Sequence, residues 1–195
     1  NQRDMEIDIL ETSSMRVIDS VAHGHYVLGV IRYHVEDEDF FRRSLAQAGL
    51  QCEQLWQSGY MALMGRDHPL ASQDSLTAEE LAPYIEIAYG DEEVPYIRTS
   101  EAEGPSEAHR GTKRILVYDR GSCLDLLRTN PYAYARSSAL PEDMLERNGL
   151  VQRKCRNGGQ FKDLIVSKQG YRFSKLDRAL IDRLCLERNK AAFRD

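Results

Sequence analysis

The segment Leu55–Asp91 constrains the fold more strongly than any other part of this chain. It contains a short apolar run, Tyr60–Met64, between Gly59 and Gly65, and such a run is typical of a strand covered on both faces. Pro69 has no amide hydrogen, and it favours extended or turn geometry in the residues before it. The chain therefore has to leave its sheet within a few residues of Gly65.

A capped helix and a second buried strand follow this exit. Thr77 and Glu80 have the spacing of a capping box, in which the hydroxyl accepts from a first-turn amide and the carboxylate reaches back. A short helix is therefore predicted to begin at Thr77. Ile85–Tyr89 predicts another buried strand, closed by Gly90 and Asp91. This order of elements predicts a chain that leaves one sheet and starts a second.

The N-terminal part of the chain has the pattern of a βαβ unit. Met5–Glu11 alternates between apolar and acidic residues, which predicts a strand with one wet face. The hydroxyl-rich start at Thr12 is followed by apolar residues at helical spacing as far as Ala22, with Gly24 as the stop. Tyr26–Tyr33 is a continuous apolar run of strand length, so we expect two parallel strands joined by a helix.

The remaining elements predict two α/β lobes. Further strands are expected within residues 55–64 and at 115–118, 132–135, 150–155 and 163–167, with helices at 36–49, 123–128 and 174–188. Residues 91–114 show no sustained period and predict a long excursion with one short helix near 106–110. Breaks in composition place the two crossings between lobes near Ser72 and near Asn157, and the last helix is expected to fold back on the first lobe.

Composition and charge exclude several classes of protein. The 195 residues are 42% hydrophobic, and the net charge is -5, so the surface repels phosphate backbones and favours no nucleic acid. No apolar run approaches the ~20 residues of a membrane-spanning helix. The cysteines form no C-x-x-C pair, which favours free thiols in a reducing cytoplasm over a disulfide framework; they are Cys52, Cys123, Cys155 and Cys185.

Polar side chains gather where the predicted strands end, and this is where α/β sheets bind ligands. We expect them to face one crevice, where helix amides and an arginine would hold a small anion while tyrosines pack against its organic part. The candidates are Thr12, Ser13, Ser14, Arg32, Tyr33, His34, Tyr89, Gly90, Asp91, Asp119, Arg120, Gly121, Ser122, Arg136 and Ser137. The alternative is that the hydroxyls are ordinary helix N-caps and that Arg120 and Arg136 pair with nearby carboxylates.

Motifs of catalysis and of metal binding do not occur in the sequence. It has no G-x-S-x-G elbow, P-loop, G-x-G-x-x-G or H-E-x-x-H motif. His23 and His25 flank Gly24 with no third ligand at a known spacing, so no metal site is predicted. His68, in a turn before proline, is expected to cap local backbone. We expect no cofactor and no catalytic residue.

The run His68-Pro69-Leu70-Ala71, set between a buried strand and Leu-Thr-Ala-Glu-Glu-Leu-Ala at 76–82, resembles the effector-binding domain of LysR-type transcriptional regulators. The resemblance extends from about Met5 to about Arg188. It implies a two-lobed type 2 periplasmic-binding-protein-like fold, with two α/β subdomains, crossover strands and an effector cleft between them. Residues 1–71 with 160–195 would form subdomain I, without the first strand and helix of the family fold, and 72–159 would form subdomain II.

The resemblance also implies a function and partners. It supports the strand-end candidates and adds Tyr118, for a small organic acid or amino-acid derivative as effector. DNA would be bound only through an N-terminal winged helix-turn-helix that this sequence does not contain. Met5–Glu11 and Ser174–Arg188 would form the surface of a homodimer or a dimer of dimers, in the cytoplasm and away from membranes. The alternatives are an extracytoplasmic solute-binding protein of a transporter and an α/β enzyme such as a prephenate-dehydratase-like lyase.

Overall fold

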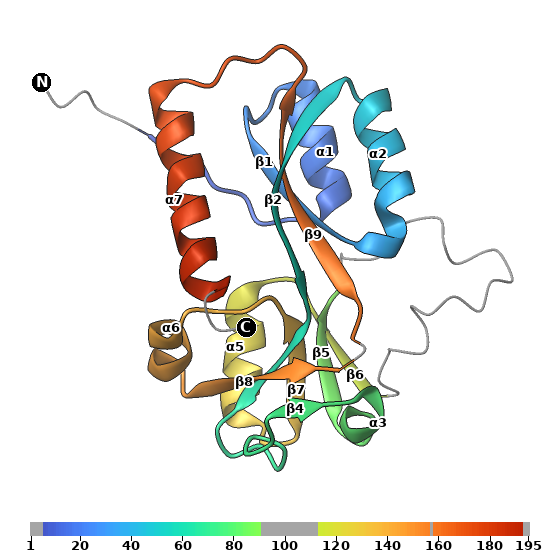
Figure 1. The fold of residues 1–195 in the computed structure, drawn as a ribbon, viewed down its shortest axis with the longest axis vertical. Helices are drawn as coiled ribbons and strands as arrows, with labels where there is room; N and C mark the ends of the chain where they lie inside the picture. The colour runs from blue at the N-terminus through green and yellow to red at the C-terminus, as the bar shows by residue number, and fades with distance from the viewer. Residues whose placement is uncertain (1–5, 91–112, 157, 193–195) are drawn as a thin grey trace, which may run out of the picture.

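The computed structural model describes residues 6–90, 113–156 and 158–192, which form two lobes stacked along the long axis of the molecule (Figure 1). The upper lobe contains a three-stranded sheet in the order β1 (Gly29–His34), β9 (Gln160–Lys168), β2 (Leu50–Gly59). The lower lobe contains a six-stranded sheet in the order β4 (Ser75–Leu76), β8 (Leu150–Cys155), β3 (Met61–Gly65), β7 (Ala133–Ser137), β5 (Ile85–Tyr89), β6 (Lys113–Val117). The helices are α1 (Ser14–His23), α2 (Glu38–Gln47), α3 (Ala78–Leu81), α5 (Arg120–Thr129), α6 (Glu142–Arg147) and α7 (Lys175–Ala192), with a 3-10 turn η1 at Val35–Asp37.

The core of the upper lobe lies between its sheet and helices α1 and α2. Ile18 and Val21 of α1 and Phe41 and Leu45 of α2 pack with alternate residues of β1 and β9 in one buried cluster. Helix α1 has the predicted limits because Ser13 caps its start and Gly24 ends it in the left-handed conformation, at φ 80°. The two helices therefore cover the same face of the sheet, and α7 lies on the other side of this lobe (Figure 1).

The sheet of the lower lobe is covered on both faces. Leu63 faces a cluster with residues of α5 and α6, whereas its neighbours Ala62 and Met64 face a second cluster with Leu76 and Leu81. The predicted two-sided burial of Tyr60–Met64 is therefore confirmed for the strand residues Met61–Gly65. The capping box of α3 is also confirmed, since Glu80 accepts from the Thr77 amide at 2.7 Å and Thr77 accepts from the Glu80 amide at 3.3 Å.

The two lobes are joined by two neighbouring passages of the chain. The first runs from β2 to β3 at Gly59–Met61, and the second runs from β8 to β9 between Cys155 and Gln160. The predicted second crossing near Asn157 agrees with this, but the crossing near Ser72 was placed too late, because Met61–Gly65 already pairs with strands of the lower sheet. The apolar run Tyr60–Met64 begins directly after the last residue of β2, and composition alone does not mark this change of sheet. The division into subdomains stays a prediction, and the sheet change indicates a first boundary near residue 60.

The predicted N-terminal βαβ unit is wrong. Residues 6–13 form no strand, and β1 pairs antiparallel with β9 in the part of the chain that the structure describes. Ile7 and Ile9 are 58% and 86% exposed. An alternating pattern predicts a strand only where a neighbouring strand can satisfy its amides and carbonyls.

Other differences concern the limits of elements. β2 begins at Leu50, five residues before the predicted start. Helix α6, whose N-cap is Pro141, was not predicted. The helix suggested near 106–110 lies outside the described residues. The predicted closing helix is confirmed as α7, but its apolar side chains lie largely outward, with Leu176 and Leu180 each 50% exposed. None of the helices in the described ranges combines the length and apolar character that a membrane span requires.

His68 caps local backbone as predicted. Its Nδ1 accepts a hydrogen bond from the Leu70 amide at 3.1 Å, its ring lies 4.5 Å from that of Tyr84, and its buried Nε2 has no hydrogen-bond partner. Burial lowers the pKa of His68 below its ordinary value because the charged imidazolium would lose its hydration. The folded protein therefore holds His68 neutral where the unfolded chain would protonate it.

This difference predicts acid sensitivity of the fold. The folded pKa of His68 is lowered, so the unfolded state binds the additional proton, and stability falls as pH decreases below about 6.5, by at most about 1.4 kcal/mol per pH unit. We expect His68→Asn, whose amide oxygen can accept from Leu70, to flatten the dependence of the unfolding free energy on pH between 7.5 and 5.5. The measurement is urea unfolding at each pH, with the exposed His25→Asn as the control. Equal slopes in the His68 variant and the wild type would contradict the assignment.

Candidate functional site

The candidate site lies between the two lobes, where the carboxyl end of β1, the crossing strands and the start of α5 meet (Figure 1). Each element ends here for a local reason: His34 begins the turn η1, Tyr60 separates β2 from β3, and Asp119 caps α5. Side chains of both lobes therefore reach the same region from positions far apart in the sequence.

Aromatic side chains line the junction between the lobes. The Tyr60 ring lies 5.1 Å from Phe161 and 5.2 Å from His34, and its hydroxyl is 3.4 Å from Nε2 of His34. Phe161 is fully buried and also contacts Trp56 edge to face. Phe161 is therefore part of the packed interior, and Tyr60 and His34 are aromatic groups here that keep exposed surface for a ligand.

Arg32 lies beside Phe161 and is held by two sets of contacts. Its guanidinium donates to both carboxylate oxygens of the buried Asp163 at 2.7 Å and lies 4.2 Å from the centre of the Phe161 ring. The Ser14 hydroxyl donates to the Arg32 carbonyl at 2.7 Å and accepts from its amide at 3.0 Å. Ser14 therefore anchors the start of α1 to the end of β1 and keeps these two candidates together.

Tyr33 does not share this location. Successive residues of a strand point to opposite faces, and Tyr33 is buried in the core of the upper lobe, stacked on Phe41 at 4.7 Å. Burial raises its pKa. His34 is on the other face and reaches Tyr60, so the structure places these two neighbouring candidates in different surroundings.

The start of α5 contributes the second group of candidates. Asp119 accepts from the amide of Ser122 at 2.8 Å and from its hydroxyl at 2.7 Å, and these bonds hold the pKa of the carboxyl below its ordinary value. Gly121 lies within the turn that they close. Arg120 instead reaches the upper lobe, where Nη2 and Nε donate to Oε1 of Glu11 at 3.1 and 3.2 Å. The contact joins the lobes immediately beside Thr12, the residue before the N-cap Ser13.

Tyr89 lies next to this contact. Its phenol is half-buried, and burial, followed by the neighbouring Cys123, raises its pKa while Arg120 opposes the rise. Gly90 follows, and an added Cβ would lie 2.5 Å from the ring of Tyr118, so this position has no room for a side chain unless that ring moves. Tyr118 itself is largely exposed. Asp91 lies outside the described residues.

Arg136 and Ser137 lie on the lower side of the junction. Arg136 Nε is 3.1 Å from the buried Glu86, whose other oxygen is 3.3 Å from Arg114. The hydroxyl of Ser137 accepts from Gln152 at 2.7 Å. Both candidates therefore take part in internal contacts of the lower lobe.

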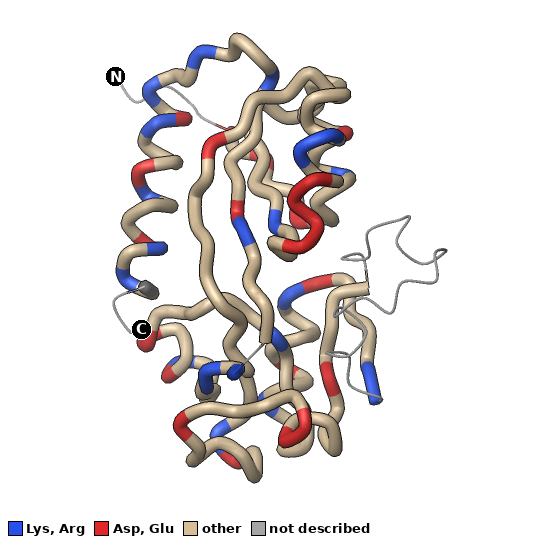
Figure 2. Tube along the Cα trace, turned by 45° about the vertical axis from the view of Figure 1, so that its right-hand side comes forward, with Lys and Arg blue, Asp and Glu red and all other residues tan. Residues whose placement is uncertain are grey.

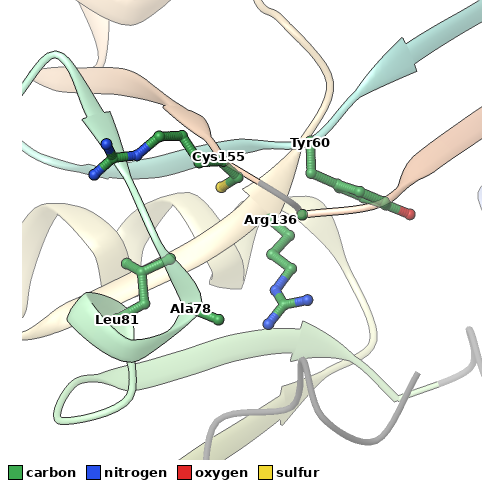
Figure 3. A pocket seen from close by; sticks show the side chains of 7 residues that line it. Tyr60, Ala78, Leu81, Arg136 and Cys155 are labelled. Carbon is green, nitrogen blue, oxygen red and sulfur yellow. The ribbon is translucent and has the colours of Figure 1, made fainter. Parts of the chain in front are cut away.

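A small pocket of about 10 Å³ opens beside Arg136. Figure 3 shows the Arg136 side chain between α3 and the crossing strands, with the Tyr60 hydroxyl directed away from the other lining side chains. The lining residues are Tyr60, Ala78, Leu81, Arg136, Cys155, Arg156 and Gly158. Burial raises the pKa of the Cys155 thiol to about 11, so this sulfur is protonated at neutral pH. The volume is sufficient for about one water molecule, not for an organic effector.

The structure thus brings many of the predicted residues into two groups, and it leaves Tyr33 and Ser137 in contacts within their own lobes. One contains Ser14, Arg32, His34 and Arg136 around Tyr60, and the other contains Thr12, Ser13, Tyr89, Asp119, Arg120 and Ser122 around Glu11. Sequence reasoning missed Tyr60, Phe161 and Glu11, although the position of Tyr60 between two glycine-bounded strands was a usable signal. The described residues contain no group of three or more side chains placed to hold a metal ion.

A larger hollow of about 590 Å³ lies beside α6 and β8, and Met61, at the end of the first crossing, is part of its wall. It is lined by side chains of both charges, including Arg66, Glu146 and Arg153. No predicted site residue lies on its wall.

Comparison with known proteins assigns the fold. The family model described as LysR substrate binding domain matches residues 1–184. The structure superposes on the oxidised form of OxyR with a TM-score of 0.60, 11% identity and coverage of 95% of this chain and 82% of that one. The effector-binding domain of QuiR in complex with shikimate superposes with a TM-score of 0.59 and 16% identity, and the match covers 91% of this chain and 78% of that one. The regulatory domain of CcmR from Synechocystis PCC6803, in complex with 2-PG, superposes with a TM-score of 0.58 and 12% identity, and the match covers 91% of this chain and 81% of that one.

These likenesses, all below 25% identity, concern the fold, and they confirm the predicted two-lobed type 2 periplasmic-binding-protein-like architecture. No match was found among curated protein sequences.

The pairing of Arg32 with Asp163 predicts that replacing this carboxylate destabilises the folded protein more than replacing an exposed one. Asp163 is 7% exposed, so Asp163→Asn leaves Arg32 without its charge partner in a partly dry site and is expected to cost about 2 kcal/mol of unfolding free energy. The matched control is Asp125→Asn, which removes an exposed partner of Arg128 and is expected to cost less than about 0.5 kcal/mol. Urea unfolding measures both. A loss for Asp163→Asn no larger than that of the control would show that the pair is not structural.

Proposed function

The chain belongs to the family of LysR substrate-binding domains, the effector-binding domains of transcriptional regulators, and we propose that it binds a small anionic molecule between its two lobes. The bound state would then be transmitted to DNA-binding domains outside this sequence. The matched family is one of regulatory domains and not of enzymes.

One observation carries the proposal: cationic and aromatic side chains from both lobes meet at the junction. Arg120 of the lower lobe contacts Glu11 of the upper lobe, and Tyr60, on the crossing between β2 and β3, packs against Phe161, which also contacts Arg32. A ligand between the lobes would contact both lobes, so its binding energy could favour one relative arrangement of the lobes over another. The solved domains of QuiR and CcmR, which share the fold, contain shikimate and 2-PG respectively.

For an effector to regulate DNA binding, a change in the arrangement of the lobes has to alter the contact with a second copy of the chain. We propose a homodimer, or a dimer of dimers, in the cytoplasm, in which residues 6–11 and the outer face of α7 are covered. The exposed Ile7, Ile9, Leu176 and Leu180 support this surface, because large apolar side chains left in water favour cover by a partner. The family match does not favour the alternative of an extracytoplasmic solute-binding protein.

The proposal is tested on the native protein with a panel of small organic acids that includes shikimate. A ligand present at 100 times its Kd is expected to add about 2.7 kcal/mol to stability, seen as a rise in the unfolding midpoint, and to change the affinity for operator DNA. We expect Tyr60→Ala to remove most of the ligand-induced rise, whereas Tyr132→Ala, on an exposed loop, leaves it unchanged.

Each variant is compared with its own ligand-free midpoint, because Tyr60→Ala also removes a contact with Phe161. The proposal fails if no acid in the panel raises the midpoint and DNA affinity is indifferent to all of them. It also fails if the two tyrosine variants lose the rise equally.

A further inference from the structure

Three arginines at the junction have the position and charge of an anion receptor, and each already contacts a carboxylate of the chain itself. Arg32 contacts Asp163, Arg136 contacts Glu86, and Arg120 contacts Glu11. A ligand anion can use one of these guanidinium groups only by displacing or sharing the carboxylate that is present.

Burial distinguishes the three contacts. The carboxylates of Asp163 and Glu86 are each 7% exposed, so water cannot readily replace the arginine that either of them would lose. Arg120 and Glu11 are 58% and 56% exposed, and pairs of this kind are worth little because water replaces the partner. Arg120 is therefore the guanidinium of the three from which a carboxylate is most readily displaced.

The Arg120–Glu11 pair also differs in what it connects. Asp163 and Arg32 both belong to the upper sheet, and Glu86 and Arg136 both belong to the lower sheet. Glu11, in contrast, precedes α1 of the upper lobe, and Arg120 begins α5 of the lower lobe. Loss of this contact changes how the lobes are coupled, whereas loss of either other pair would weaken a single lobe.

The surroundings of Arg120 suit one oxyanion and its organic part. The half-buried phenol of Tyr89 lies close enough that the charges of Arg120 and Glu11 both act on its pKa, so an aromatic side chain is present in the neighbourhood of this pair. The amides at the start of α5 are capped by Asp119 and leave the guanidinium as the group that holds Glu11. A position that already holds a carboxylate against an arginine fits a carboxylate or a phosphate oxygen.

We propose that Glu11 is a built-in competitor for the effector: in the free protein it occupies Arg120, and the carboxylate or phosphate of the effector takes its place. This inference rests on the proposed function and adds the anchoring residue and the event that binding triggers. Exchange of Glu11 for a ligand anion breaks the direct contact between residues 11 and 120, so occupancy of the site and coupling of the lobes are linked.

The test measures the binding of inorganic phosphate and of shikimate to the native protein by the shift of the unfolding midpoint, at constant ionic strength. Glu11→Gln removes the competitor and is expected to lower the half-saturating concentration by about two- to fivefold. Arg120→Gln is expected to raise it by about tenfold or more, because the charged donor is lost. Glu6→Gln, an equal change of charge in the same exposed segment, is expected to leave it unchanged.

Several results would overturn the inference. Equal effects of Glu6→Gln and Glu11→Gln would show that the change in affinity is a general effect of net charge. A failure of phosphate to bind the Glu11→Gln protein would show that Arg120 does not form an anion site. An organic acid whose binding depends on Tyr60 but not on Arg120 would overturn this inference and leave the proposed function standing. Failure of every organic acid to bind would instead contradict the proposed function.

Discussion

The antiparallel pairing of β2 with β9 is the interaction on which the rest of the structure depends. The two strands pair from Leu50 with Lys168 to Gly59 with Gln160, and each then continues into the other lobe. Register shifts at Gln54–Trp56, and such an irregularity increases the local twist and bend of a ribbon. The lobes are therefore joined by a hydrogen-bonded pair of strands and not by a flexible linker, and Tyr60 and Phe161 lie where this ribbon leaves the upper sheet. Relative movement of the lobes has to bend or twist this pair of strands, so the proposed contact of a ligand with Tyr60 would act directly on the connection.

The arginines at the junction form ion pairs with carboxylates of the same chain, and the burial of each pair determines how readily it can be broken. Figure 2 shows acidic and basic residues distributed over both lobes, in keeping with a surface on which single charges have little effect at a distance. In the interior the situation is different: Glu86 lies between Arg114 and Arg136, and Asp163 binds Arg32 through both oxygens. These contacts hold guanidinium groups in place as parts of the fold. Arginine next to a strand end is therefore an insufficient indicator of a ligand site, and the exposure of its carboxylate partner is the more informative property.

Local chemistry predicted much of the fold, and long-range pairing accounts for most of the rest. Thr77 with Glu80, Gly24 after α1, and the apolar run at Met61–Gly65 contain their own stop and start signals within a few residues, and the structure agrees with each. The alternation at 6–11 predicted a strand that the fold does not form, because alternation says nothing about whether a partner strand is present. Asp163 lies 131 residues from Arg32, and nothing near either residue indicates the other. The candidate residues came from strand ends, and some of these ends meet between the lobes. The contrast between Tyr33 and His34 follows from side-chain alternation and became clear only once the partner strand was known.

A weak contact between the lobes is suited to the proposed role for an energetic reason. An exposed ion pair contributes between about 0 and 1 kcal/mol, which biases an equilibrium between two lobe arrangements without fixing it. A ligand shifts such an equilibrium only by its difference in affinity for the two arrangements, so a strong pair would have to be outweighed by much tighter binding. Arg120 and Glu11, each more than half exposed, lie in the weak range, whereas the pair Arg32–Asp163 does not. Ion pairs of the same chemistry therefore differ in effect according to their burial. The buried carboxylates of Asp163 and Glu86 stabilise single lobes, whereas the exposed pair of Arg120 and Glu11 is weak enough to be exchanged for a ligand in the proposed mechanism.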